Sequence, residues 1–288
     1  MKGGDESGAT STKLHSYKIA RMPGEGKPRR GPLQEPPANI HRVSPTVLYF
    51  ASGESLYSGA VILLLAVVTS SWPLRRCLNW VRRIAIWIGL ALMIMACPPF
   101  SWIVETIFGL TVLVWLTVDS RTSSGQGRGT AKMAARGALV GLLVLLSAIE
   151  FGHRRIPDIR GIAGNRVIVL GDSISSGLGT RVQPWPAVMQ QMTGVVVENL
   201  SKQGATVADG VGMASQIRAE DHLAVIELGG NDLIAGEPSD SFAHELEMLL
   251  AKVAAPGRTL VMFELPLLPH MIGYGRAQRR LAARYAFG

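Results

Sequence analysis

Four long runs of hydrophobic residues dominate the pattern of the first half of the chain. A helix that crosses a bilayer needs about 20 mostly apolar residues, with a range of about 17 to 25. The first and third runs reach this length alone, whereas the second and fourth need flanking residues. We therefore predict a membrane domain at residues 46–152 with four transmembrane helices. They are expected near residues 56–72, 84–98, 100–118 and 134–151.

The pattern changes in the last third of the chain, where short apolar runs alternate with helix-like stretches. In the clearest of these stretches, Asp240–Ala255, apolar residues recur every three or four positions. Strands that alternate with helices predict βαβ units and a parallel sheet. We predict an α/β domain at residues 165–288 and a linker at residues 153–164. The predicted strands lie at residues 166–170, 195–198, 223–228 and 259–265.

Residues 1–45 differ from both regions because they are rich in proline and glycine and show almost no apolar periodicity. Such a segment cannot bury enough apolar surface to offset its chain entropy. We therefore predict a disordered basic tail. The alternative is that translation begins at Met22 or later.

The composition favours a membrane protein over a nucleic-acid-binding one. Apolar residues make up 48% of the chain and charged residues 17%, whereas soluble domains carry about 25% charged residues. The net charge is +8, but residues 164–288 carry 10 basic and 12 acidic residues. The predicted α/β domain is therefore slightly acidic, and we expect no nucleic-acid partner. The two cysteines, Cys77 and Cys97, are too few for a disulfide scaffold or a cysteine-ligated zinc site.

Basic residues between the apolar runs predict the orientation of the helices. The links after the first and third runs are basic, whereas the Pro98-Pro99 link carries no charge. Basic residues near helix ends are retained in the cytoplasm. We therefore expect a multi-pass protein of the cell membrane whose α/β domain is periplasmic or extracellular. Arg154, Arg155 and Arg160 follow the fourth run and oppose this orientation.

The residues that follow the predicted strands indicate acyl transfer. Ligands of open parallel sheets bind beyond the carboxyl ends of the strands, where this sequence places Ser173, Gly204, Asn231 and His270. Ser173 follows a strand and begins a helix, whose positive end favours a developing anion. The amides of Ser173 and Gly204 and the side chain of Asn231 are suitable donors to an oxyanion. Neither a dinucleotide-binding glycine motif after the first strand nor a P-loop is present.

Three segments, VIVLGDSISSGLG, ENLSKQGAT and VIELGGNDLIAG, together resemble the motif blocks of the SGNH (GDSL) hydrolase superfamily. The resemblance covers about Arg166–Ala286 and is greatest to the lysophospholipase and acyl-thioesterase branch. It implies a three-layer, flavodoxin-like parallel sheet, with Ser173 as nucleophile and Gly204 and Asn231 completing the oxyanion hole. It further implies hydrolysis of a small acyl ester or acyl thioester through an acyl-serine intermediate, with no metal and no organic cofactor.

The sequence departs from this family pattern near its carboxyl end. The family takes its base from an Asp-x-x-His block, and this sequence contains no Asp-x-x-His. We therefore expect a sheet that is incomplete at the C-terminus. The chain is a truncated or frameshifted product, an inactive relative that binds envelope ligands or partners, or an enzyme with His270 as substitute base. Without a base, a serine is a poor nucleophile at neutral pH.

Several charged or titratable residues of the chain could bind a ligand, but we expect structural or surface roles for most of them. Asp172 and Asp232 are of the type that binds metals, but we expect them to anchor loops through backbone hydrogen bonds. His222 and His244 are expected on the surface. Glu105 is expected to be hydrated at the membrane interface. A solvated helix face, or alternatively a contact with anionic lipid, is expected for Arg276, Arg279, Arg280 and Arg284.

Overall fold

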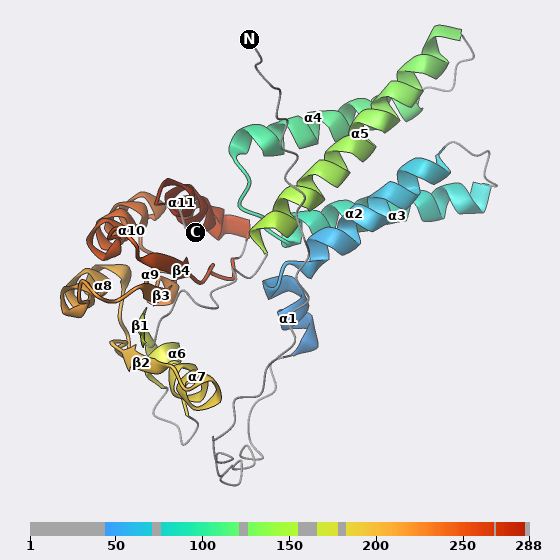
Figure 1. The fold of residues 1–288 in the computed structure, drawn as a ribbon. Coiled ribbons are helices and arrows are strands. Elements are labelled where there is room, and N and C mark those ends of the chain that lie inside the picture. Colours follow the sequence, from blue (N-terminus) through green and yellow to red (C-terminus); the bar gives the residue numbers. More distant parts are fainter. Residues whose placement is uncertain are drawn as a thin grey trace, which may run out of the picture. The chain divides into compact units, whose positions relative to one another are not determined.

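The first half of the chain is helical, and the second half forms a parallel sheet with helices on both faces (Figure 1). The computed structural model describes residues 44–70, 76–120, 126–154, 166–177, 183–267 and 269–285. The predicted tail, apart from residues 44 and 45, lies outside the described residues, as does the linker beyond Arg154. The helices of the first half are α1 (Pro45–Ala51), α2 (Glu54–Thr69), α3 (Arg76–Met95), α4 (Trp102–Ser120) and α5 (Gln126–His153).

Each predicted membrane span is helical, but only two of the described helices have the length and composition to cross a membrane. These spans are Trp102–Ser120 and Gly129–His153. Helix α2 has 16 residues, which extend about 24 Å at 1.5 Å per residue, less than the roughly 30 Å of a bilayer core. Helix α3 has 20 residues but carries arginine in its first two turns, so its uncharged part is shorter. The structure therefore supports two of the four predicted spans.

Two glycines bring α2 and α3 into close contact. A Cβ on Gly89 would lie 2.8 Å from Leu63 Cγ and 3.1 Å from the Gly59 carbonyl oxygen. Helix α2 contributes the fully buried Leu56 and Leu63 to a core that also holds Ile86 and Met93 of α3 and Trp115 of α4. Small residues let helix backbones approach closely. The helical region is therefore packed by both glycine contacts and large apolar side chains.

An ionic cluster joins the helices at one end. Arg136 of α5 donates to Asp119 Oδ1 at 2.7 Å and to the Ser70 carbonyl oxygen at 2.8 Å. Arg82 of α3 lies 4.0 Å from the Asp119 carboxylate. The end of α4 and the N-terminal halves of α3 and α5 therefore meet here.

Strand β1 is an inner strand of the sheet, and the connections that follow β1 and β2 run in opposite directions across the sheet. The order is β2-β1-β3-β4, and all three pairings are parallel. Gly171 at the end of β1 pairs with Glu227 at the end of β3. The carboxyl end of β1 is therefore the topological switch point, where ligands of open α/β sheets bind. The strands are β1 (Arg166–Gly171), β2 (Val196–Asn199), β3 (Leu223–Glu227) and β4 (Thr259–Met262).

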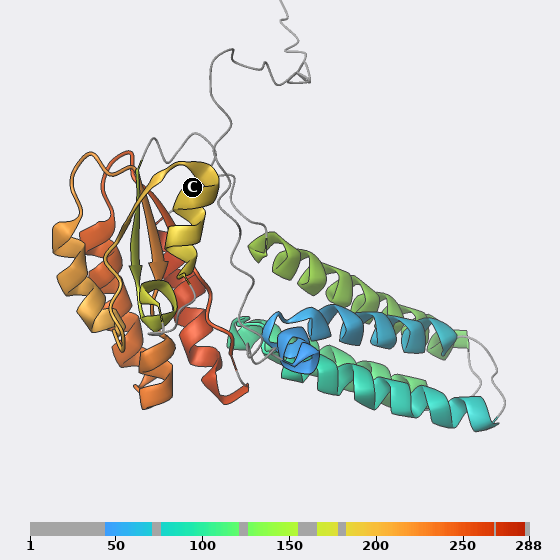
Figure 2. The ribbon, with the colours of Figure 1, turned by 90° about the horizontal axis from the view of Figure 1, so that it is seen from below.

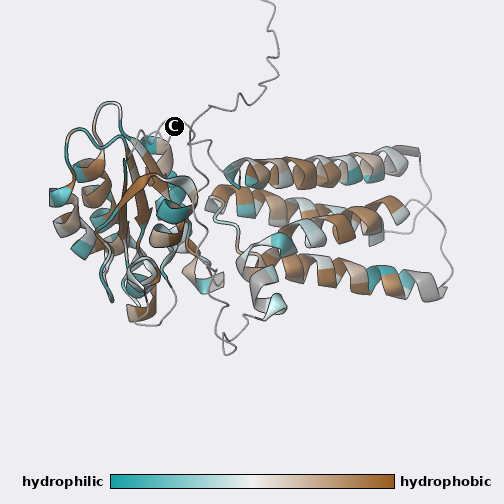
Figure 3. Cartoon of the chain, turned by 60° about the horizontal axis from the view of Figure 1, so that its bottom comes forward, coloured by the Kyte–Doolittle hydropathy of each residue, from teal (hydrophilic) through white to brown (hydrophobic). Residues whose placement is uncertain are grey.

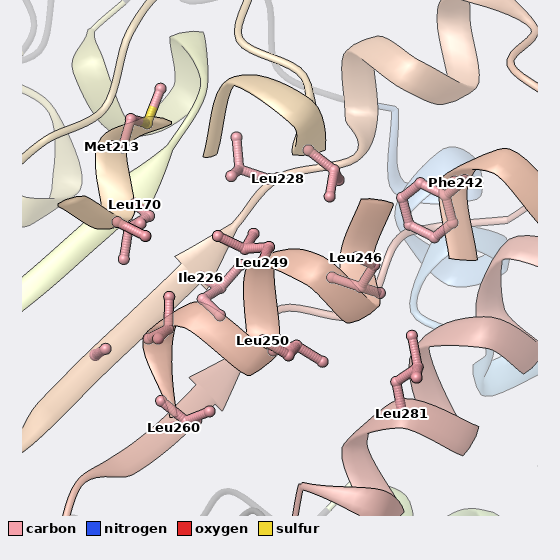
Figure 4. Close-up of a cluster of buried hydrophobic side chains, with 14 of the residues drawn as sticks. Leu170, Met213, Ile226, Leu228, Phe242, Leu246, Leu249, Leu250, Leu260 and Leu281 are labelled. Atoms are coloured by element: carbon pink, nitrogen blue, oxygen red, sulfur yellow. The ribbon is translucent and has the colours of Figure 1, made fainter. Parts of the chain in front are cut away.

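Alternating side chains of the strands build a core on each face of the sheet. Val167 and Val169 of β1 face α7 on one side, with Trp185 and Met189 packed against them. Ile168 and Leu170 belong to the opposite core with residues of α8, α10 and α11 (Figures 2 and 4). This alternation follows the two-residue period of a strand. The remaining helical elements are α6 (Ser173–Ser176), α7 (Trp185–Thr193), α8 (Val207–Met213), η1 (Ala214–Gln216), α9 (Gly230–Ala235), α10 (Ser239–Val253), η2 (Pro269–Met271) and α11 (Ile272–Arg284).

The predicted helix at residues 240–255 corresponds to α10, and its predicted apolar face is buried. Phe242, Leu246, Leu249, Leu250 and Val253 all lie in the core (Figure 4). The predicted parallel α/β sheet is thus confirmed in the described residues, with strand ends within a few positions of those expected.

Most hydrophobic residues of α4 face outward, apart from Val112 and Trp115, which are buried in the helical core. Only 11% of its apolar stretch is buried, and Leu110 and Leu113 are more than half exposed. In Figure 3 the long helices are coloured as hydrophobic along most of their length, whereas the outer helices of the α/β region carry hydrophilic patches. An apolar surface of this extent marks a membrane or protein contact in a folded protein.

The Gly59–Gly89 contact predicts a selective loss of stability. Replacing Gly89 with valine forces α2 and α3 apart, and overpacking of this kind costs about 1–3 kcal/mol. We expect Gly89→Val to lower the melting temperature of the purified protein in detergent. Gly109→Val is the matched control, because a Cβ at this helical glycine meets nothing within 4 Å. Equal melting temperatures for the two variants would show that the contact does not stabilise the helices.

Candidate active site

Ser173 lies in a turn at the carboxyl end of β1. It is the first residue of α6 and is partly exposed. The preceding Asp172 is 4% exposed, and its Oδ1 accepts a hydrogen bond from the Ile174 amide at 2.9 Å. The Asp172 amide donates to the Glu227 carbonyl oxygen at 3.2 Å. The turn that presents Ser173 is therefore fixed by hydrogen bonds on both sides.

The loop that carries Gly204 is attached to the same strand. The Leu200 amide donates to the Val169 carbonyl oxygen at 2.9 Å, and the Lys202 amide donates to that of Gly171 at 3.1 Å. Gly204 has a φ of +72°, and a Cβ there would meet nothing within 4 Å. Its left-handed backbone conformation, rather than a lack of space, is the reason for glycine at this position.

Asn231 joins the two loops. It lies in the first turn of α9, and its Nδ2 donates to the Ala205 carbonyl oxygen at 2.8 Å. The same nitrogen lies 3.4 Å from Asp172 Oδ2. Because Ala205 follows Gly204 and Asp172 precedes Ser173, the structure brings the loops of all three predicted site residues together.

Asp232 anchors the neighbouring helix α8. Its side chain is 1% exposed, and its carboxylate oxygens lie 3.1 and 3.2 Å from the Val207 amide, which donates to them. Burial raises the pKa of the Asp232 carboxyl above its usual value, and the Val207 hydrogen bond lowers the pKa in part. Asp172 and Asp232 thus anchor loops, as predicted. No cluster of three or more potential metal ligands is found among the described residues.

The histidines lie on the surface. His222 and His244 are exposed, as predicted, and His270 is exposed on η2. Within the described part of the chain, the Ser173 turn receives no hydrogen bond from any of the three. His270 as a substitute base therefore gains no support from these contacts.

Sequence reasoning missed Glu227, the last residue of β3. Its Oε2 accepts hydrogen bonds from Ser175 Oγ at 2.8 Å and from the Asp172 amide at 3.4 Å. The sequence did contain a signal for this residue, because Glu227 is a charged residue at the end of an otherwise apolar strand. A charged group at such a position requires hydrogen-bond partners.

The arginines of α11 form ion pairs, and a solvated face is the wrong interpretation for Arg276 and Arg279, whereas Arg284 is exposed as predicted. Arg279 donates to both oxygens of Glu150 at 2.8 and 3.1 Å. Arg276 donates to Glu105 at 2.6 Å, and Arg284 pairs with Glu247. Glu105 therefore has a protein partner in addition to its solvent contact. The predicted helix periodicity placed these arginines on one face, but their acidic partners lie far away in the sequence.

The fold defines a parallel α/β domain with polar loops at the carboxyl ends of its strands. A model of the GDSL-like Lipase/Acylhydrolase family matches residues 169–286. The chain is 33% identical over 116 residues to Esterase TesA of Pseudomonas aeruginosa, an alignment that covers 38% of this chain and 58% of the relative. It is 29% identical over 123 residues to an arylesterase of Vibrio mimicus, covering 40% and 60% respectively. Residues 169–286 belong to the GDSL-like lipase/acylhydrolase family.

A solved structure gives a similar match. The crystal structure of TesA matches with a TM-score of 0.38 and 30% identity, over 42% of this chain and 74% of that chain. The chain spans less than two thirds of the length of both esterase relatives.

The Asp232 anchor predicts a loss of stability that does not depend on catalysis. Asp232→Ala leaves the buried Val207 amide without its acceptor, which costs about 1–3 kcal/mol. We expect a lower melting temperature for this variant. The control, Glu220→Ala, removes an exposed carboxylate and should melt as the unmodified protein does. A melting temperature of Asp232→Ala equal to that of the control would contradict the anchoring role.

Proposed function

We propose that the domain at residues 165–288 hydrolyses carboxylic esters or thioesters through an acyl-serine intermediate on Ser173. The observation that carries the proposal is the position of Asn231, whose amide is bonded to the Gly204 loop and lies beside the Ser173 turn. The two relatives are named as esterases, which supports this reaction class.

The reaction requires a nucleophile and a site for negative charge. Ser173 Oγ forms a bond to the acyl carbon, its proton passes to a base, and the carbonyl oxygen becomes an oxyanion. The intermediate collapses with loss of the alcohol or thiol, and water then releases the acid from the serine. We assign stabilisation of the oxyanion to the amides of Ser173 and Gly204 and to Asn231 Nδ2. Loss of one such donor typically costs about 10²–10³ in rate.

The hydrogen bonds of Asn231 suit this role. Its 2.8 Å bond to the Ala205 carbonyl oxygen holds the amide group in place. Its second contact, to Asp172 Oδ2, is long at 3.4 Å and therefore weak. The N–H that faces Asp172 can donate to an oxyanion instead, at the loss of only this weak contact. The N–H that is bonded to Ala205 continues to orient the side chain.

The alternative function is a catalytically inactive membrane protein that binds envelope ligands or partners. It is favoured by the lack of a hydrogen bond from a histidine to the Ser173 turn within the described residues.

We further propose that residues 46–152 anchor the domain in the cell membrane through four transmembrane helices. Two of these helices have a spanning length, and exposed apolar residues cover α4. The ionic cluster around Asp119 gathers basic residues at one end of the helices, where we place the cytoplasm. With this topology the hydrolase domain is periplasmic or extracellular.

Covalent labelling tests the proposed chemistry. A fluorophosphonate probe should modify the unmodified protein but not Ser173→Ala, because the probe captures an activated serine. Ser176→Ala is the matched control, because it removes a hydroxyl from the same helix and should still be labelled. Failure to label the folded protein would overturn the hydrolase proposal and favour the binding alternative.

Reporter fusions test the topology. Alkaline phosphatase attached at the carboxyl end should be active, because it folds to its active form only after export. A fusion placed after Ser120, in a predicted cytoplasmic link, should be inactive. The reverse pattern of activities would contradict the proposed orientation.

A further inference from the structure

Glu227 contacts both sides of the turn that presents Ser173. Its Oε2 accepts hydrogen bonds from the amide of Asp172, the residue before the serine, and from the hydroxyl of Ser175, two residues after it. The Glu227 carbonyl oxygen accepts a second bond from the Asp172 amide. The end of β3 therefore fixes the geometry of a turn that belongs to β1 and α6.

The hydroxyl of Ser175 has a defined direction. Trp185 Nε1 lies 2.9 Å from Ser175 Oγ, and an indole nitrogen can only donate. Ser175 accepts this bond and must use its own hydrogen for Glu227, at 2.8 Å. The chain of donors thus runs from Trp185 through Ser175 to the carboxylate.

Ser175 is also held by packing. Its side chain is fully buried, and a Cβ on Gly171 would lie 2.6 Å from its Oγ. Asn199 Nδ2 donates to the Ser175 carbonyl oxygen at 2.7 Å. A side chain with so little freedom transmits the position of Glu227 directly to the turn.

The Glu227 carboxylate is held at an electrostatic cost. Burial raises the pKa of Glu227 above its usual value, the Ser175 hydrogen bond lowers it, and the negative charge of Asp172 raises it again. Asp172 is the charged group that acts on Glu227 among the described residues. Ser175, Trp185 and Asn199 of the same cluster are neutral. A carboxylate in such a position requires a structural or functional reason.

We propose that Glu227 is a positioning residue for Ser173, which it holds in the attacking geometry through Ser175 and the Asp172 amide. The inference rests on the proposed function, since it assigns a purpose to the geometry of the Ser173 hydroxyl. Glu227 does not touch the reacting atoms in this role. It acts through the turn. Because Trp185 donates to the Ser175 hydroxyl, this hydroxyl must donate its own hydrogen to Glu227.

The rate of fluorophosphonate labelling tests this role. A displacement of a reacting group by about 1 Å can cost about 10²-fold, so Glu227→Ala should lower the labelling rate by about tenfold or more. Glu227→Gln retains an acceptor for Ser175 and should stay within about threefold of the unmodified protein. The control Glu198→Gln removes a carboxylate of β2 that pairs with Arg166 instead, and should leave the rate unchanged. Ser175→Ala removes only the connecting hydroxyl and should also lower the rate; it replaces Glu227→Ala if that variant does not fold.

Two results of this experiment have different meanings. If the unmodified protein is labelled and Glu227→Ala or Ser175→Ala reacts equally fast, the positioning role is wrong and the hydrolase proposal stands. If the unmodified protein is not labelled, the hydrolase proposal fails. The hydrogen bonds from Trp185 to Ser175 and from Ser175 to Glu227 are then tested by the indole signal of Trp185.

The Trp185 indole N–H reports on the contacts without any catalysis. In protein labelled with ¹⁵N-tryptophan, its NMR signal is assigned by its absence in Trp185→Phe. We expect this signal to titrate with a midpoint above the ordinary Glu value of about 4.3, because Glu227 binds its proton more tightly in the folded chain. The titration should vanish in Glu227→Gln and persist in Glu198→Gln. A signal that titrates identically in Glu227→Gln would overturn the connection from Glu227 through Ser175 to Trp185.

Discussion

The candidate site depends on the hydrogen bonds of one buried residue, Asp172. Its carboxylate accepts from the Ile174 amide and lies beside Asn231, and its amide donates to Glu227. It therefore connects β1, α6, α9 and β3 at the switch point of the sheet. A buried carboxylate without these donors would be strongly unfavourable. The same bonds that make its burial tolerable also fix the relative positions of the serine turn and the asparagine.

The α11 ion pairs follow a similar physical logic in a different part of the molecule. Glu150 is 4% exposed and receives two hydrogen bonds from Arg279, while Arg154 of its own helix adds a third. Removing one partner of a buried ion pair leaves an uncompensated charge. Residues of α11 and of α4 and α5 are therefore held together by charge.

Much of the α/β domain follows from its sequence, because strand periodicity and strand-end glycines are local signals. The four strands, their parallel arrangement and the buried face of α10 were predictable in this way. The loops of Ser173, Gly204 and Asn231 were predictable because parallel strands end at one edge. The pairings of Arg276 with Glu105 and of Arg279 with Glu150 were not, since each of these carboxylates lies more than 100 residues away on another helix. Glu227 was missed because its role depends on Ser175 and Trp185, which only tertiary packing brings to it.

The acidic character of the site constrains its chemistry. Asp172, Glu227 and Asp232 all lie at the sheet edge where an oxyanion would form, and negative charges near an oxyanion oppose it. The structure limits this repulsion because Asp172 and Asp232 are turned toward backbone amides, which offset their charge. Neutral amide donors such as Asn231 then stabilise the oxyanion without attracting the neighbouring carboxylates as strongly as a cation would. The polar residues of the site are therefore arranged so that carboxylates provide rigidity and amides provide the favourable electrostatic field.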